Sequence, residues 1–335
     1  MTFELPVETH PGRIRAVTLG ATRDQGGTRT STVTVGGASS MPFLWFEGEY
    51  PHPPAIGMEV YDTLPERYPP VLKDVFGDLL ARPEEMAKHL VEKCGADVIS
   101  LRLDGTHPEK GNRSAKEASE VVRAVLGRVG VPIIVNGHGH FEKSNEVLRR
   151  VAEEHAGERL LLSWVETENY RTVAAACLAY GHCLVAQSPI DFNIAKQLNI
   201  LLSNMDFPPD RIIIDPLTSA VGYGNEYSYS VMERLRLGAL SGDEMTQMPM
   251  IVTAGWECLR AKEAAAPASE YPQWGELERR LVNWEVNTCG SLLLAGGDLL
   301  VVNHPESVKR LRALVRDLMG DRVSSIQGCG LTAQG

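Results

Sequence analysis

The sequence lacks several features that would place it in common functional classes. No run of about 18 apolar residues occurs in the 335 residues, and a transmembrane helix needs one. Positive charge is not in excess either, because 33 Lys and Arg stand against 43 Asp and Glu, for a net charge of −10. No stripe of Lys and Arg occurs. These absences argue against a membrane-spanning protein and against a nucleic acid partner.

Targeting and metal-binding signatures are also missing. The first residues, MTFELPVETHPGR, resemble neither a secretory signal nor a transit peptide rich in Arg and Ser, so we expect a cytoplasmic protein. The six cysteines contain no C-x-x-C pair, which argues against a zinc site or an iron–sulfur cluster held by this chain alone. They are Cys94, Cys177, Cys183, Cys258, Cys289 and Cys329.

Signatures of nucleotide binding and of acyl transfer are absent as well. Neither G-x-x-x-x-G-K-[ST] nor a strand followed by G-x-G-x-x-G occurs, so neither ATP nor NAD binding is indicated. No nucleophile elbow and no Ser, His and Asp arrangement can be identified. The sequence therefore points to no catalytic side chain.

The main positive feature is a strand–helix repeat. Eight apolar, β-branched segments alternate with eight helix-patterned segments, which is the count of a (β/α)₈ TIM barrel of the α/β class. An open doubly wound sheet is the alternative, but no reversal point is visible. The predicted strands cover 55–61, 96–103, 131–137, 159–165, 182–188, 211–216, 248–255 and 299–304.

The segments between these strands carry helix start and stop signals. Segment 82–95 has Pro83 in its first turn, acidic residues next and a glycine at its end. Segments 114–130 and 144–157 also end at glycine. The predicted helices cover 82–95, 114–130, 144–157, 172–181, 194–205, 229–240, 276–296 and 306–320.

The ends of the chain differ from the repeat. IRAVTLG and STVTVGG are short β-branched runs on either side of the Gly26-Gly27 turn region, and FLWF follows, so residues 13–46 read as all-β with a hairpin. We assign 1–54 to an N-terminal β extension, 55–320 to the barrel and 321–335 to a flexible C-terminal tail.

Polar residues follow the predicted strands, at the end of a barrel where functional sites lie. The sixth strand, RIIIDP, ends at Asp215, which either belongs to a site or only stabilises the following turn. Lysine is nearly absent from the strand ends. This composition favours a neutral, hydrogen-bonding ligand or a protein partner over a sugar phosphate.

Two local patterns suggest metal binding, but neither meets its requirements. His138-x-His140 resembles the histidine pair of hydrolase barrels, yet it follows the third strand and its flanking glycines suit a tight turn. The stretch 104–111, DGTHPEKG, superficially resembles the D-x-H-x-x-G motif of cobalamin ligation. Its His107 stands three residues after the Asp instead of two, so we assign no metal ligand.

Five long loops of unusual composition carry a family resemblance. They are ATRDQGGTRTSTVTVGG (21–37), MPFLWFEGEYPHPP (41–54), DGTHPEKGNRS (104–114), IVNGHGHFEKSNEVL (134–148) and DPLTSAVGYGNEYS (215–228). They resemble the small subunit of the corrinoid iron–sulfur protein, whose archaeal equivalent is the delta subunit of the acetyl-CoA decarbonylase/synthase complex. The resemblance runs from about residue 13 to about residue 320.

The resemblance implies a TIM barrel that pairs with a large subunit in the reductive acetyl-CoA (Wood–Ljungdahl) pathway. The large subunit would carry the [4Fe–4S] cluster and most of the corrinoid (cobalamin) site. The pair would take a methyl group from methyltetrahydrofolate through a separate methyltransferase and deliver it to acetyl-CoA synthase, the partner of CO dehydrogenase. This chain would be non-catalytic or co-catalytic.

In that role the barrel mouth covers one face of the corrinoid, and hydrogen-bonding groups would meet the amide arms of the macrocycle. The expected corrinoid-facing residues are Asp104, Thr106, Asn136, Gly137, Asp215, Thr218, Gly222 and Tyr223.

Two other functions remain open. Pterin-dependent methyltransferases are also barrels, and Asn136 in V-N-G and Asp215 in I-D-P-L resemble the residues that hold their pterin ring. In that case the chain would bind methyltetrahydrofolate itself. A purely architectural subunit is the third possibility, although it would have little need of glycine-rich, polar strand ends.

Overall fold

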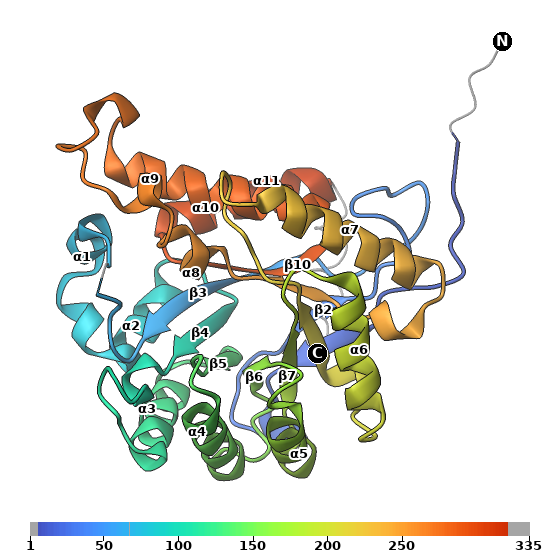
Figure 1. Cartoon of the computed structure of the whole chain (residues 1–335), viewed down its shortest axis with the longest axis horizontal. Coiled ribbons are helices and arrows are strands. Elements are labelled where there is room, and N and C mark those ends of the chain that lie inside the picture. The colour runs from blue at the N-terminus through green and yellow to red at the C-terminus, as the bar shows by residue number, and fades with distance from the viewer. Residues whose placement is uncertain (1–5, 67, 321–335) are drawn as a thin grey trace, which may run out of the picture.

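Eight parallel strands form a closed barrel in the computed structural model, which describes residues 6–66 and 68–320 (Figure 1). Each strand pairs with the next along the chain, and β10 closes the ring by pairing with β3. The predicted TIM barrel is therefore confirmed. The strands are β3 (Ala55–Tyr61), β4 (Val98–Arg102), β5 (Ile133–Asn136), β6 (Leu161–Val165), β7 (Cys183–Gln187), β8 (Ile212–Asp215), β9 (Met250–Val252) and β10 (Gly297–Val302).

Helices surround the barrel on its outside (Figure 1). The predicted helices are all present, and short additional ones, α1, α8 and α9, lie in the loops after β3 and β9. The helices are α1 (Pro70–Phe76), α2 (Pro83–Glu92), α3 (Ala115–Arg128), α4 (Phe141–Glu154), α5 (Tyr170–Tyr180), α6 (Phe192–Ser203), α7 (Asn225–Leu240), α8 (Ala254–Cys258), α9 (Lys262–Ala265), α10 (Leu277–Leu294) and α11 (Pro305–Met319).

Helix α3 shows how the sequence produces this outer layer. Ser114 caps its first turn and forms a capping box with Glu117, which satisfies backbone N–H groups that have no partner inside the helix. Ala118, Val122 and Val125 recur at helical spacing and are fully buried. That face packs on the barrel, while the charged face remains in solvent.

The predicted N-terminal hairpin is present and closes one end of the barrel. Strands β1 (Ala16–Leu19) and β2 (Val33–Gly36) pair antiparallel. Val17, Leu19 and Val35 belong to the same apolar cluster as residues inside the barrel. Gly20 N–H donates to the carbonyl of Arg159, just before β6, at 3.0 Å. The hairpin therefore covers the N-terminal ends of the barrel strands.

The FLWF segment, residues 43–46, was expected to be β structure, and that expectation is wrong. It forms turns, and Phe43 has a left-handed backbone with φ of 62°. Its rings pack with Tyr50, with centroids 5.2 Å apart for Phe43 and 5.5 Å for Trp45. The indole of Trp45 also donates to the carbonyl of Leu318 in α11. Packing against a helix explains this apolar run, so no strand is needed.

The extension is fastened to the barrel by Arg29, which is 3% exposed. Its Nε donates to Glu158 Oε2 at 3.0 Å. Its Nη1 and Nη2 donate to the carbonyls of Val129 and Leu126 at the C-terminal end of α3. A guanidinium at this position also satisfies carbonyls that the helix leaves without partners.

No helix among the described residues is long and apolar enough to span a membrane. The predicted tail, 321–335, lies outside the described residues.

Substituting Arg29 tests the fastening of the extension. Arg29→Met should lower the free energy of unfolding by about 3–5 kcal/mol, because Glu158 would remain buried without its partner. Urea denaturation followed by circular dichroism measures the change. Arg13→Met is the matched control, since the Arg13–Glu49 pair is 3.1 Å long but has side chains that are 62% and 75% exposed. It should cost less than about 1 kcal/mol. Equal losses in both variants would contradict this role of Arg29.

Candidate functional site

A buried arginine occupies the C-terminal mouth of the barrel. Arg102 is the last residue of β4, and its Nε donates to Glu59 Oε1 of β3 at 3.2 Å. The guanidinium carbon lies 4.2 Å from the ring centroid of Trp256, in α8. Burial opposes its charge, but acidic neighbours led by Glu59 hold the pKa of Arg102 above its ordinary value. Arg102 is therefore a fixed positive charge in the mouth.

Several carboxylates gather around this charge. Burial raises the pKa of Glu59 in spite of Arg102, and Glu59 Oε2 has no hydrogen-bond partner among the described residues. Burial also raises the pKa of Glu257, which the positive charges of Arg260 and Arg102 partly offset. The positive charge of Arg102 also acts on Asp215 of β8, where it opposes the rise in pKa caused by burial. The mouth is acidic overall, and the positive charge of Arg102 reduces the repulsion among its carboxylates.

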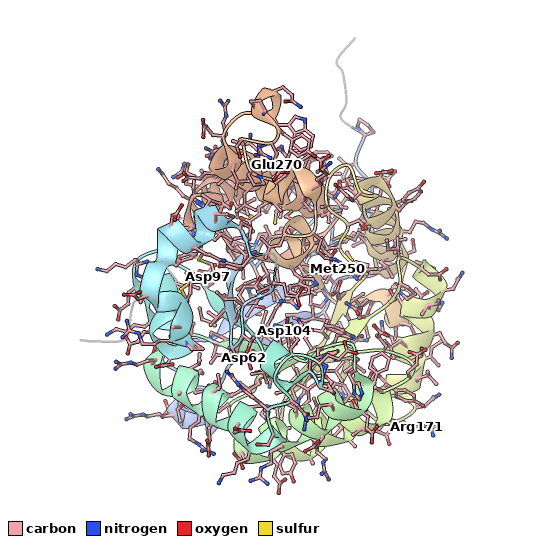
Figure 2. The ribbon with its side chains drawn as sticks, turned by 60° about the vertical axis from the view of Figure 1, so that its left-hand side comes forward. Asp62, Asp97, Asp104, Arg171, Met250 and Glu270 are labelled. Carbon is pink, nitrogen blue, oxygen red and sulfur yellow. The ribbon has the colours of Figure 1, made fainter. Side chains whose placement is uncertain are left out.

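The loop after β4 places Asp104 and Thr106 in the mouth. Asp104 Oδ2 accepts from Lys110 Nζ at 2.8 Å, and Thr106 Oγ1 donates to the Leu103 carbonyl. Asp62 lies beside Asp104 near the middle of the molecule (Figure 2) and accepts from Gly105 N–H. Burial raises the pKa of Asp62 to about 6. These acids shape the loop and have partners in it.

Three imidazoles lie against this loop. The ring centroids of His107, His138 and His140 are 4.9 to 6.5 Å apart. His138 Nδ1 accepts from the backbone N–H of His140, so its Nε2 carries the proton and donates to Thr106 Oγ1 at 2.8 Å. Burial, followed by the charge of His107, lowers the pKa of His138 to about 4. Within residues 6–66 and 68–320, no group of three or more His, Cys, Asp or Glu residues could hold a metal ion.

Asn136 and Gly137, at the end of β5, are buried and closely packed. Asn136 Nδ2 donates to Ser100 Oγ at 2.9 Å and to the Leu101 carbonyl at 3.3 Å. A Cβ atom on Gly137 would lie 1.9 Å from Ser144 Oγ, so a larger residue would force this hydroxyl away from the His138 N–H that it accepts from. Both residues are in the mouth, where the sequence predicted them.

Asp215 and Thr218 connect neighbouring strands. Asp215 accepts from Gln187 Nε2 of β7 at 3.0 Å and from the Leu217 N–H at 2.9 Å. Burial, the largest influence, raises the pKa of Asp215 to about 6. Thr218 Oγ1 accepts from the Thr253 N–H after β9. The loop after β8 is thus fixed to strands on both sides.

Gly222 and Tyr223 lie farther out, on the rim. Tyr223 is 49% exposed, and its hydroxyl donates to Glu263 Oε2 at 2.8 Å and accepts from the Lys262 N–H at 3.0 Å. Gly222 has φ of +80°, which disfavours a side chain there. Six predicted residues are therefore buried in the mouth, and these two form its exposed edge. That the eight face a corrinoid stays a prediction.

The sequence alone assigned no role to Arg102 or Trp256. Arg102 ends the strand VISLR, and a single charge at the end of a buried strand looks like its boundary. Gln187 was also without an assigned role, although it is the partner of Asp215. A charged residue closing an otherwise apolar strand was the available signal.

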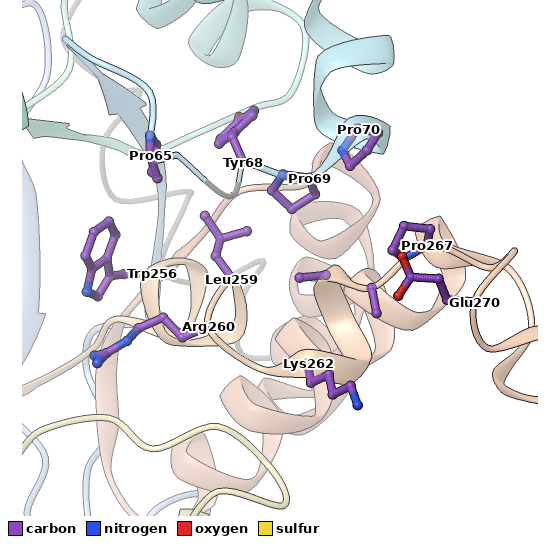
Figure 3. Close-up of a pocket in the computed structure, with 12 residues that line it drawn as sticks. Pro65, Tyr68, Pro69, Pro70, Trp256, Leu259, Arg260, Lys262, Pro267 and Glu270 are labelled. Atoms are coloured by element: carbon purple, nitrogen blue, oxygen red, sulfur yellow. The ribbon is translucent and has the colours of Figure 1, made fainter.

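Two pockets open on this face. The larger, about 870 Å³, lies between the loop after β3 and the segment after α8 (Figure 3). Its wall is mostly prolines and apolar side chains, including Tyr68, Trp256 and Leu259. The smaller, about 190 Å³, lies at the ends of β6 and β7. Neither is lined by Asn136 or Asp215.

Substituting Asp215 tests its buried state. Burial favours the protonated carboxyl of Asp215. Its contribution to the free energy of unfolding is therefore complete below pH 3.8, the pKa of this group in the unfolded state, and is lost as the pH rises through about 6. The stability of the wild type relative to Asp215→Asn should therefore fall by about 2 kcal/mol between pH 4 and pH 8. Urea unfolding across this range measures it, with exposed Asp74→Asn as the control substitution. A constant difference between wild type and Asp215→Asn would contradict the buried state.

Solved structures with the same fold include dihydropteroate synthases. The enzyme from Coxiella burnetii in complex with pteroic acid has a TM-score of 0.54 and 12% identity, covering 90% of this chain and 98% of that one. The enzyme from Xanthomonas albilineans gives a TM-score of 0.51 and 13% identity, covering 82% and 97%. At these identities the likeness shows the barrel fold alone.

Sequence comparison is more specific. The family model for the CO dehydrogenase/acetyl-CoA synthase delta subunit matches residues 16–322. The acetyl-CoA decarbonylase/synthase complex subunit delta of Archaeoglobus fulgidus is 39% identical over 325 residues, covering 95% of this chain and 71% of that protein. Its counterpart in Methanocaldococcus jannaschii is 35% identical over 319 residues, covering 95% and 77%. With the loops described above and a match over nearly its whole length, this chain belongs to the CO dehydrogenase/acetyl-CoA synthase delta-subunit family.

Proposed function

We propose that this chain is the barrel subunit of a heterodimeric corrinoid iron–sulfur methyl carrier. Its partner would be a large subunit that holds the [4Fe–4S] cluster and most of the corrinoid. The pair would receive a methyl group from methyltetrahydrofolate through a methyltransferase and pass it to acetyl-CoA synthase. Family membership supports a place in this chemistry, since the relatives are named as delta subunits of the acetyl-CoA decarbonylase/synthase complex.

The observation that carries the proposal is the state of the polar groups in the mouth. Asp104 is paired with Lys110, Asn136 with Ser100, and Asp215 with Gln187. An enzyme that binds and protonates its own substrate needs an acid or base within reach of that substrate. A mouth in which Asp104, Asn136 and Asp215 are already bound within the chain is better suited to cover a cofactor held by another protein. We therefore assign no catalytic residue to this chain.

The rim has groups that suit the chemistry of a corrinoid. The primary amide arms of a corrinoid need hydrogen-bond donors and acceptors, and the exposed loop at Gly222 and Tyr223 offers backbone groups beside the ring of Tyr223. The larger pocket beside it presents apolar surface around Trp256. The bound corrinoid would supply the reactive cobalt that accepts and gives up the methyl group. The residues of this chain would orient the amide arms and exclude water.

The alternative is a pterin-dependent methyltransferase that binds methyltetrahydrofolate itself. Asn136 and Asp215 do lie in one mouth, as that function requires. Their side chains are only 3% and 2% exposed and are bonded within the chain, so a pterin would have to displace those partners. The carrier subunit is the better supported function.

Purification from the native host at low ionic strength tests the proposal. We expect a second, larger chain and a visible spectrum with corrinoid and iron–sulfur absorbance. Calorimetric titration of the isolated chain with methyltetrahydrofolate should show no binding. A colourless homo-oligomer would refute the carrier function, and folate binding by the isolated chain would favour the methyltransferase.

Variants of exposed aromatic residues test which end of the barrel meets the large subunit. Tyr223→Ala, at the mouth, should weaken binding to the large subunit about tenfold or more, as buried interface tyrosines commonly do. Phe46→Ala is the matched control, because Phe46 is 47% exposed in the N-terminal extension. It should change the affinity less than about twofold. Surface plasmon resonance gives both dissociation constants, and the reverse order would place the interface at the extension.

A further inference from the structure

The smaller pocket at the ends of β6 and β7 has features that the proposed function does not use. It measures about 190 Å³ and lies next to the mouth, outside the cluster around Arg102. Its walls come from the loops after β6, β7 and β8 and from the start of α6. Its lining residues are Glu166, Thr167, Glu168, Gln187, Ser188, Pro189, Ile194 and Leu217.

The lining is acidic and carries no positive charge of its own. It includes the carboxylates of Glu166 and Glu168 but no Lys or Arg. Burial raises the pKa of Glu166, and the nearby charges of Glu168 and Asp215 raise it further. Gln187 directs its Nε2 to Asp215, so its Oε1 remains available as an acceptor. Acceptors therefore outnumber donors in this pocket.

A buried hydroxyl in the wall also lacks a partner. Ser188 is fully buried, and its Oγ makes no hydrogen bond to any described residue. Buried hydroxyls without partners are unfavourable and uncommon in folded proteins. Because Ser188 lines the pocket, a group entering the pocket could satisfy it.

The backbone beside the pocket is strained. Ile190 has φ of 47° and Leu217 has φ of 67°, and both are left-handed conformations that disfavour branched side chains. Such conformations persist where the surrounding structure enforces them, often at binding sites.

We infer that this pocket binds the ammonium or guanidinium head of an organic cation. The carboxylates of Glu166 and Glu168 balance the charge, the Gln187 Oε1 and Ser188 Oγ accept N–H donors, and an aliphatic stem lies against Pro189, Ile194 and Leu217. The head can belong to a free amine or to a Lys or Arg side chain of a protein bound at this face. This site does not depend on the corrinoid or on the proposed function.

Binding of small probes to the isolated, ¹⁵N-labelled chain tests the site. Butylammonium and butylguanidinium should shift the amide resonances of residues 166–168 and 187–188, with dissociation constants on the order of millimolar. Butyramide and 1-butanol, which have similar shape but no charge, should not shift them. Equal shifts from butyramide, or no shifts from either cation, would overturn the inference.

Variants locate the binding and separate it from folding. Glu168→Gln should weaken butylammonium binding about fivefold or more, and Ser188→Ala should weaken it while leaving the apo protein at least as stable. Glu153→Gln, an exposed acid at the far end of α4, removes the same charge and should leave the affinity unchanged. If Glu153→Gln and Glu168→Gln weaken binding equally, attraction by net charge explains the result and the site is rejected.

The source of the head group is decided with the native assembly. If a partner side chain fills the pocket, butylammonium should slow assembly with the other subunits, and Glu168→Gln should weaken that assembly. If a free amine fills it, assembly should be unaffected while the probe still binds. Both results retain the cation site, whereas a Glu168→Gln chain that binds the probe like the wild type overturns it.

Discussion

The ion pair between Arg102 and Glu59 is the interaction on which the functional end of this barrel depends. Without a buried positive charge, the carboxylates that converge from β3, the loop after β4, β8 and α8 would repel one another in a poorly solvated space. Arg102 is held in place by Glu59 on one side and by the Trp256 ring on the other. The same ring forms part of the larger pocket on the surface. The charge balance of the mouth and the shape of its rim are therefore coupled through one side chain.

The two ends of the barrel have opposite character. Val17, Leu19 and Val35 of the hairpin extend the apolar interior and close the N-terminal end, and Arg29 fastens this cover to α3. The predicted site residues lie at the opposite end. A buried ion pair adds little net stability and can even lower it, so the apolar base has to supply the folding energy that the mouth does not. The stability that the apolar base supplies lets the mouth contain buried acids while the protein stays folded.

The barrel was predictable from the sequence because a buried strand and an amphipathic helix each impose a period on the chain. The strand ends also placed Asp104, Asn136 and Asp215 in one mouth. What could not be predicted depends on contacts between distant segments. Arg102 contacts Trp256 in α8, a helix too short to show a helical period in the sequence. The apolar segment 43–46 has the same sequence pattern whether it packs on a strand or on a helix.

The acids of the mouth fall into two groups that differ in how their charge is balanced. Near Arg102, the negative charge is partly balanced by this arginine within the chain, which gives a fixed surface suited to a neutral, amide-bearing cofactor. At the ends of β6 and β7, Glu166 and Glu168 have no cation among the residues that line their pocket. Uncompensated charge is tolerated where solvent or a ligand can reach it, and this pocket is where a cation from outside the chain would find its charge balanced. The mouth therefore has one region whose acids face an internal cation and another whose acids face only what binds there.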